Sequence, residues 1–235
     1  MTAVWIASDW HLAPETPPGE AALARRFLAR AREAGARVVL NGDVFDDLFA
    51  GPGRAEAAHP EIAAAIGALA AEGRLARTRG NHDPDAGVER EVLEVPGLGR
   101  VLVAHGHAAD PLSRSALGRF GDGISRRYGR LALVRGAARL AERAARAVAE
   151  ERMIALFRRR CLALLDEAGC DLGVFGHVHR PHLAPGDRYV NAGALAASGL
   201  SYLVLEAGRA RLAALGAEDA PRRGRESGGV PVDLR

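Results

Sequence analysis

Five short motifs contain most of the side chains of this sequence that could bind a metal ion. They are Ser-Asp-Trp-His (8–11), Asn-Gly-Asp (41–43), Gly-Asn-His-Asp (80–83), Ala-His-Gly-His (104–107) and Gly-His-Val-His (176–179). Each motif follows an apolar run that is typical of a buried strand. Six of the eight histidines of the chain fall in these motifs. Such a concentration favours a shared chemical role over scattered structural roles.

The motifs supply a mixed set of oxygen and nitrogen ligands. The set comprises Asp9, His11, Asp43, Asn81, His105, His177 and His179. We expect two divalent ions, with Mn²⁺ as the first choice and Fe, Zn or Mg as alternatives, because these ligand types alone do not select one metal. The two oxygens of Asp43 could bridge such a pair. Two metals about 3.5–4 Å apart activate water and bind a phosphoryl group, so phosphoester chemistry is expected.

The expected secondary structure brings these motifs to one edge of the fold. Strand patterns cover 3–8, 37–41, 75–79, 88–95, 100–104, 171–175, 189–191, 200–206 and 209–215, and helical spacing covers 20–34 and 59–72. Strands alternate with helices in the first half and hairpins dominate the end, which favours an α/β sandwich of two sheets flanked by helices. Loops at the carboxyl ends of the strands would converge on one crevice.

A helical insertion is expected between His105 and His177, over residues 113–168. Within it, segment 113–160 has 13 Arg against four acidic residues, a balance of +9 in a chain whose net charge is +3. A basic block of this kind attracts phosphate, nucleic acid or an anionic membrane surface. We expect one domain over residues 1–215 and a polar, disordered tail over 216–235.

Composition indicates the cellular setting. The sequence begins without the features of a signal peptide, and its apolar runs are shorter than the ~20 residues of a membrane-spanning helix. Its two cysteines, Cys161 and Cys170, favour a reduced intracellular protein. We therefore expect a cytoplasmic protein, with peripheral contact to the inner membrane as one use of the basic segment.

The order of the motifs resembles that of calcineurin-like metallophosphoesterases. Asp-x-His, Gly-Asp-x-x-Asp, Gly-Asn-His-Asp, Gly-His and Gly-His-x-His follow one another between residues 8 and 179. The resemblance implies a four-layer β-sandwich with flanking helices, a helical cap insertion and a dinuclear metal centre. It implies one ion bound by Asp9, His11, Asp43 and His179, and a second bound by Asp43, Asn81, His105 and His177.

Further residues of the motifs are candidates for the same site. The resemblance implies that His82 faces the phosphate, where it would stabilise charge or protonate the leaving oxygen. Asp83 is expected either to hold the other ring nitrogen of His82, as a catalytic partner, or to cap the turn before Pro84. Asp46 is expected to support the ligands without binding metal. His107 either borders the site or supports it through a hydrogen bond.

The substrate is less constrained than the chemistry. Chain length, the Gly-His-Val-His-Arg-Pro motif and the basic insertion are similar to those of UDP-2,3-diacylglucosamine pyrophosphatases of lipid A biosynthesis, whose helical cap covers a nucleotide lipid. Within the basic segment, Arg126, Arg127 and Arg130 are candidate contacts for a pyrophosphate, because they fall around Gly129, an expected bend, and guanidinium groups bind phosphate oxygens in pairs.

Two departures keep other substrates open. His82 stands where that subfamily commonly has Arg, and His107 stands where it commonly has Asp. Both favour a generic metallophosphodiesterase or phosphatase that acts on small nucleotides. A nuclease is a third alternative, which the low aromatic content of 5% disfavours because few rings could stack on bases. Nucleic acid is therefore not the expected partner.

Overall fold

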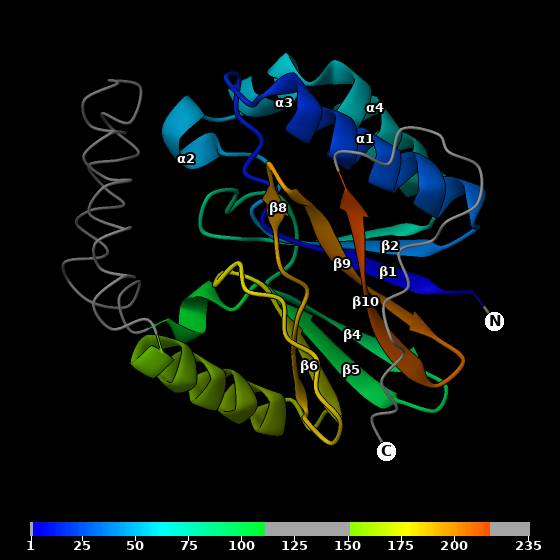
Figure 1. The fold of residues 1–235 in the computed structure, drawn as a ribbon, viewed down its shortest axis with the longest axis vertical. Helices are drawn as coiled ribbons and strands as arrows, with labels where there is room; N and C mark the ends of the chain where they lie inside the picture. The colour runs from blue at the N-terminus through cyan, green and yellow to red at the C-terminus, as the bar shows by residue number, and fades with distance from the viewer. Residues whose placement is uncertain (1, 111–150, 217–235) are drawn as a thin grey trace.

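A computed structural model describes residues 2–110 and 151–216 of the chain. Within these residues two sheets lie face to face between helices (Figure 1). The expected substrate contacts Arg126, Arg127 and Arg130 lie outside the described residues. So do most of the expected insertion and nearly all of the expected tail.

The first sheet has the strand order β10-β9-β1-β2-β3, with β8 paired to β9. Its strands are β1 (Val4–Ala7), β2 (Arg37–Asn41), β3 (Leu75–Thr78), β8 (Leu195–Ala196), β9 (Gly199–Glu206) and β10 (Arg209–Gly216). The second sheet has the order β4-β5-β6-β7. Its strands are β4 (Arg90–Val95), β5 (Gly99–Ala104), β6 (Leu172–Phe175) and β7 (Tyr189–Asn191).

Helices cover the outer face of each sheet. The labelled helices are α1 (Pro18–Glu33), α2 (Asp47–Ala50), α3 (Arg54–Ala58) and α4 (Pro60–Ala71), and a 3₁₀ turn, η1, covers His107–Ala109. Helices α1 and α4 lie over the first sheet, and a helix at residues 151–167 lies over the second (Figure 1). The layers are therefore helix, sheet, sheet, helix, which confirms the expected four-layer sandwich.

Alternation along the strands explains why two sheets stack in this way. In β1, Ile6 packs into the core between the sheets, whereas Ala7 packs against the helices of the first sheet. In β5, Val101 and Val103 enter the core between the sheets, whereas Leu102 faces the helix at 151–167. Successive side chains of a strand point to opposite faces, so both faces of these strands are apolar and both are covered.

Within the described residues, the expected strands and the helices expected over 20–34 and 59–72 are all present, and their ends lie within two residues of the expected positions. Helix α1 begins earlier than expected, because Pro18 occupies its first turn, where a missing N–H costs no hydrogen bond. The short helices α2 and α3 and the two-residue strand β8 were not expected. They are too short to show a period in the sequence.

Candidate metal centre

Parallel pairing brings the ligand motifs to one edge of the sandwich. Strands β1, β2 and β3 run parallel to one another, so the loops that follow them, with Asp9, Asp43 and Asn81, leave at the same edge. Strands β5 and β6 are also parallel, and His105 and His177 follow them at their carboxyl ends. We call this edge, where the five motifs meet, the metal edge.

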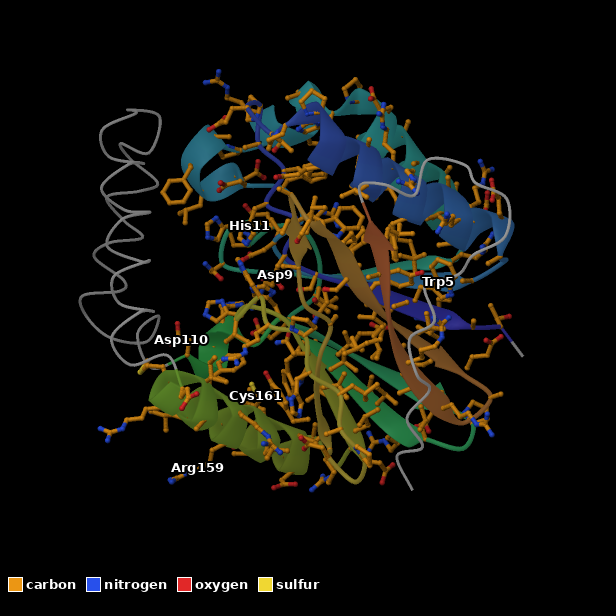
Figure 2. All side chains as sticks on the ribbon, in the orientation of Figure 1. Trp5, Asp9, His11, Asp110, Arg159 and Cys161 are labelled. Carbon is orange, nitrogen blue, oxygen red and sulfur yellow. The ribbon has the colours of Figure 1, made fainter. Side chains whose placement is uncertain are left out.

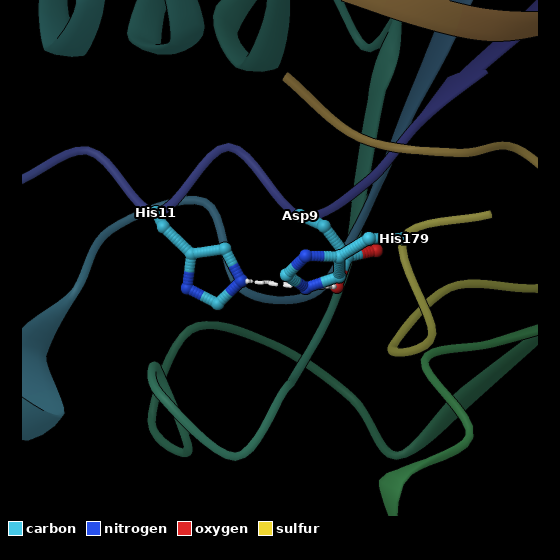
Figure 3. A group of neighbouring side chains, drawn as sticks. All are labelled: Asp9, His11 and His179. Carbon is cyan, nitrogen blue, oxygen red and sulfur yellow. Dashed lines mark hydrogen bonds and ion pairs between the residues drawn. The ribbon is translucent and has the colours of Figure 1, made fainter. Parts of the chain in front are cut away.

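One group of ligands at the metal edge contains Asp9, His11 and His179. The Nε2 atoms of His11 and His179 lie 3.1 Å apart, and His179 Nε2 lies 3.2 Å from Asp9 Oδ1 (Figure 3). Asp9 is fully buried, while the two imidazoles are partly exposed. The three donor atoms therefore converge on one point, and the two histidines are partly accessible to solvent.

A second group contains Asp43, His105 and His177. His105 Nε2 lies 3.1 Å from Asp43 Oδ2, and His177 Nδ1 lies 3.2 Å from the amide oxygen of Asn81. Asp43 also belongs to a third group, with His11 and His82. Its carboxylate thus lies between the two sets of donors, where a shared ligand would have to lie.

The backbone at the ligands is strained. Positive φ angles at described residues other than glycine occur at Asp9 (58°), His11 (46°), Asp43 (53°), His177 (68°), His179 (55°) and one hairpin alanine. A left-handed conformation costs a residue with a β-carbon about 1–3 kcal/mol, and such strain gathers where geometry serves a function. Five of the seven expected ligands are held in this way.

The glycines of the motifs make room for the ligands. A β-carbon at Gly42 would lie 2.7 Å from the ring of His105. A β-carbon at Gly80 would collide with the Asp43 carboxylate, and one at Gly176 would collide with Ser8 and Asp9. Here glycine is needed because the ligand side chains pass directly over the neighbouring backbone.

Hydrogen bonds from buried groups hold the ligands in place. His105 Nδ1 lies 2.9 Å from the Asn41 carbonyl oxygen, which directs Nε2 toward Asp43. The backbone N–H of His177 donates to both oxygens of Asp9, each at 3.0 Å. Asn191, which is fully buried, donates to the carbonyl of Gly176 and so supports the loop that bears His177. Such contacts fix the ring that a metal would bind.

Buried charges face one another across the site. Burial alone would raise the pKa of Asp43, but His105, His82 and His11 hold it well below its ordinary value. Burial alone would lower the pKa of His105, but Asp43 and Asp9 raise it to about 10. For His11, burial and the neighbouring His82 lower the pKa to about 4. Neighbouring histidines likewise lower the pKa of Asp9, so the carboxylates of Asp9 and Asp43 both remain ionised.

The donor atoms fit a divalent cation. His105 Nε2 is buried and makes no hydrogen bond within the described residues, although Asp43 Oδ2 lies 3.1 Å away. A buried polar atom without a hydrogen bond is costly, and a metal ion is one explanation for it. Imidazole nitrogens, carboxylates and an amide oxygen, gathered around two ionised carboxylates, are a set that Mn²⁺, Fe²⁺ or Zn²⁺ accepts.

His82 is oriented by Asp46, and the expected contact with Asp83 is wrong. His82 Nδ1 lies 2.8 Å from Asp46 Oδ1, and the His82 ring lies 4.5 Å from that of His11. The Asp83 carboxylate instead accepts hydrogen bonds from the backbone N–H groups of Asp43, Val44 and Gly80. Asp83 therefore ties the two ligand loops together through their backbone, and Asp46 is the carboxylate that meets His82 Nδ1.

Two residues near η1 complete the surroundings. The His107 ring lies 5.6 Å from that of His105, and burial together with His105 and His177 lowers the pKa of His107 to about 4. Asp110 Oδ2 lies 3.0 Å from His177 Nε2. Asp110 was not expected at the site, because a single aspartate outside the motifs gives no signal in the sequence.

Comparison with known proteins identifies the class to which this fold and these ligands belong. Residues 2–181 match the sequence profile of the calcineurin-like phosphoesterases. The chain therefore belongs to the calcineurin-like phosphoesterase family.

Among characterised relatives, the UDP-2,3-diacylglucosamine hydrolase of Bordetella pertussis is 34% identical over 117 residues, which cover 44% of this chain and 45% of that protein. The same protein of Bordetella parapertussis matches equally well. The chain thus spans less than half the length of the curated relatives it matches.

Solved structures show the same fold at low sequence identity. Vps29 from Entamoeba histolytica, complexed with Zn²⁺, superposes with a TM-score of 0.53 at 14% identity, over 100% of both chains. A dimetal phosphatase from Danio rerio superposes with a TM-score of 0.52 at 12% identity, over 92% of this chain and 96% of that one. At these identities the likeness concerns the fold alone.

Among residues 2–110 and 151–216, no helix combines the length and the apolar character that crossing a bilayer requires.

Proposed function

We propose that the protein is a metal-dependent phosphoesterase that uses two divalent ions, with Mn²⁺ as the first choice. The observation that carries this proposal is the convergence of two donor groups on either side of Asp43. Asp9, His11 and His179 would hold one ion, Asn81, His105 and His177 would hold the other, and Asp43 would touch both. Bound there, the metal pair would supply a water of lowered pKa and positive charge for the phosphoryl oxygens.

The residues of the chain would divide the remaining work. His82 lies beside His11, and its Nδ1 is engaged by Asp46. With its ring oriented by Asp46, His82 would give a proton to the leaving oxygen. In the reaction one water oxygen joins phosphorus, the bond to the leaving oxygen breaks, and that oxygen takes the proton. Asp46 acts through His82 by fixing the orientation of its ring.

For the substrate we propose a nucleotide lipid that resembles UDP-2,3-diacylglucosamine. The partial identity with hydrolases of that name supports it. The basic segment 113–160, with its balance of +9, also supports it, because the segment lies between the expected ligands His105 and His177 in the sequence. Arg126, Arg127 and Arg130 remain the proposed pyrophosphate contacts. The same segment would draw the protein to an anionic membrane surface, where such a lipid lies.

A specific observation favours a second candidate, a phosphodiesterase that acts on small nucleotides. The His82–Asp46 pair forms a complete proton donor, at a position where the nucleotide-lipid hydrolases commonly have Arg. An enzyme with its own proton donor can cleave a diester whose leaving group is a poor one. The two candidates share the metal centre and differ in the substrate that the enzyme would cleave.

Hydrolysis of two substrates in ¹⁸O-labelled water distinguishes these candidates. With Mn²⁺, UDP-2,3-diacylglucosamine should yield UMP and diacylglucosamine 1-phosphate, with one labelled oxygen in one product. A cyclic mononucleotide, whose alkoxide leaving group needs a proton, serves as the small diester. Hydrolysis of the small diester alone would establish the second candidate, and failure on both substrates would contradict the proposed chemistry. A phosphorylated residue trapped during turnover would also contradict it.

The proposed role of the basic segment has its own test. Replacing Arg126, Arg127 and Arg130 together with Gln should raise KM for the nucleotide lipid and leave KM for the small diester unchanged. The small substrate needs only the metals and His82. An equal effect on both substrates would remove these arginines from substrate recognition.

A further inference from the structure

Asp110 contacts the Nε2 edge of the His177 ring, which is turned away from the proposed ligand set. Its Oδ2 lies 3.0 Å from His177 Nε2, and both side chains are mostly buried, with exposures of 18% and 15%. In Figure 2, Asp110 lies on the same side of the molecule as Asp9 and His11. Asp110 closely follows η1 and thus stands just before the segment 113–168 in the sequence.

Four neighbouring side chains hold the His177 ring. Nδ1 lies 3.2 Å from the Asn81 amide oxygen, on the side of the donor group. The Phe157 ring covers it at a centroid distance of 5.7 Å, and the His105 ring meets it edge-on at 5.4 Å. Because these neighbours hold the plane of the ring, the two nitrogens point in set directions, one toward Asn81 and one toward Asp110.

A neutral imidazole carries one proton on one of its two nitrogens. If Nε2 carries that proton and donates it to Asp110, Nδ1 keeps its lone pair directed at the metal. A carboxylate behind a metal-bound histidine fixes this tautomer and strengthens the ligand. Other ligands have their own supports. His105, for example, is held by the Asn41 carbonyl and does not depend on Asp110.

We infer that Asp110 is a positioning residue that holds His177 in the tautomer and orientation required for metal binding through Nδ1. The inference rests on the metal-binding part of the proposed function and is independent of the substrate. It predicts that the carboxylate of Asp110 serves one of the two metal positions and leaves the other unaffected.

Calorimetric titration of the metal-free protein with Mn²⁺ alone tests the inference. The unaltered protein should bind two ions. Asp110→Ala should weaken one of the two binding steps by about 10–100-fold and leave the other unchanged. Asp110→Asn keeps an oxygen that accepts a hydrogen bond, and it should restore most of the lost affinity. A merely structural role would lower both affinities together.

Asp187 provides a matched control. It also contacts a histidine, with Oδ2 at 2.7 Å from His182 Nε2, but His182 belongs to neither donor group. Asp187→Ala should therefore leave both binding steps unchanged. In the Zn²⁺-loaded protein, nitrogen-15 spectra should show a protonated Nε2 and a metal-bound Nδ1 in His177.

Three results would overturn the inference. They are unchanged affinities in Asp110→Ala, an equal loss at both positions, or a metal-bound Nε2 in His177. If the unaltered protein binds fewer than two ions, the proposed dinuclear function fails as well. That failure is visible before any variant is made and is thereby distinct from a failure of Asp110 alone.

Discussion

Left-handed backbone occurs at both ends of the two sheets. At the hairpin end, where the turns around Gly97 and Gly208 touch, most of the positive φ angles belong to glycines. At the metal edge they belong to Asp9, His11 and Asp43 as well as to glycines. Glycine accepts this conformation without steric cost. The metal edge therefore keeps side chains where folding alone favours glycine, and the difference is a cost in stability that function explains.

Buried ionisable groups show the same contrast between the metal edge and the layer beneath the helix at 151–167. In that layer, burial raises the pKa of the Cys161 thiol and of the Tyr189 phenol, so both stay neutral. At the metal edge, Asp43 is equally buried, but the neighbouring His105 and His82 hold its pKa well below the ordinary value, so its carboxylate stays ionised. The first region buries neutral groups, and the metal edge buries a negative charge that attracts a cation.

The largest expected effect concerns His82, at the metal edge. His82→Ala should lower turnover by about 10²–10⁴-fold, because it removes the proposed proton donor. Both metals should remain bound, since His82 is not an expected ligand. Arg209→Ala, at an exposed position of the hairpin end, is the control and should leave turnover unchanged. Steady-state kinetics with metal analysis measures both, and normal turnover in His82→Ala would remove it from the chemistry.

A smaller effect tests the strained backbone directly. In the metal-free protein, His179→Gly should be more stable than His179→Ala by about 1 kcal/mol, because only alanine has a β-carbon to clash at φ 55°. Ala207→Gly at the hairpin end, where φ is 50°, should stabilise the protein to a similar degree.

Urea unfolding measures the free energies of these variants. Ala64→Gly, inside helix α4, is the control with the opposite effect. Glycine there should lower the free energy of unfolding by about 1 kcal/mol. If alanine proves as stable as glycine at position 179, the metal edge is not strained.

The smallest effect concerns Cys161, a free and fully buried thiol. Its raised pKa disfavours the thiolate, which is the form that reacts. In a Cys170→Ser variant at pH 8, a thiol reagent should label Cys161 only as the protein unfolds. The labelling of Cys161 should therefore increase with urea in step with the loss of structure. Rapid labelling of the native protein would show that this layer is open, and the contrast with the metal edge would weaken.

The sheets and the metal ligands could largely be predicted from the sequence, because each ligand motif follows a strand. Alternating apolar residues predict the strands, and each ligand motif follows a strand, so parallel pairing brings the motifs together. The partner of His82 could not be predicted in the same way. Asp83 is adjacent in sequence, but the loop turns it toward the backbone of Asp43, and Asp46 reaches the ring from another loop.

Asp110 shows the same limit. Its role depends on its contact with His177, which the position of η1 brings about. No spacing in the sequence predicts that contact. Contacts between loops that are far apart in the chain follow from packing, whereas motifs follow from local order. Residues that support the ligands are for this reason harder to predict than the ligands themselves.

Anomalous scattering from crystals soaked in Mn²⁺ tests the central claim most directly. Two peaks per chain, about 3.5–4 Å apart on either side of Asp43, are predicted. One peak should lie against Asp9, His11 and His179, and the other against Asn81, His105 and His177. A single fully occupied peak, with Asn81 and His105 turned away from it, would contradict the dinuclear centre.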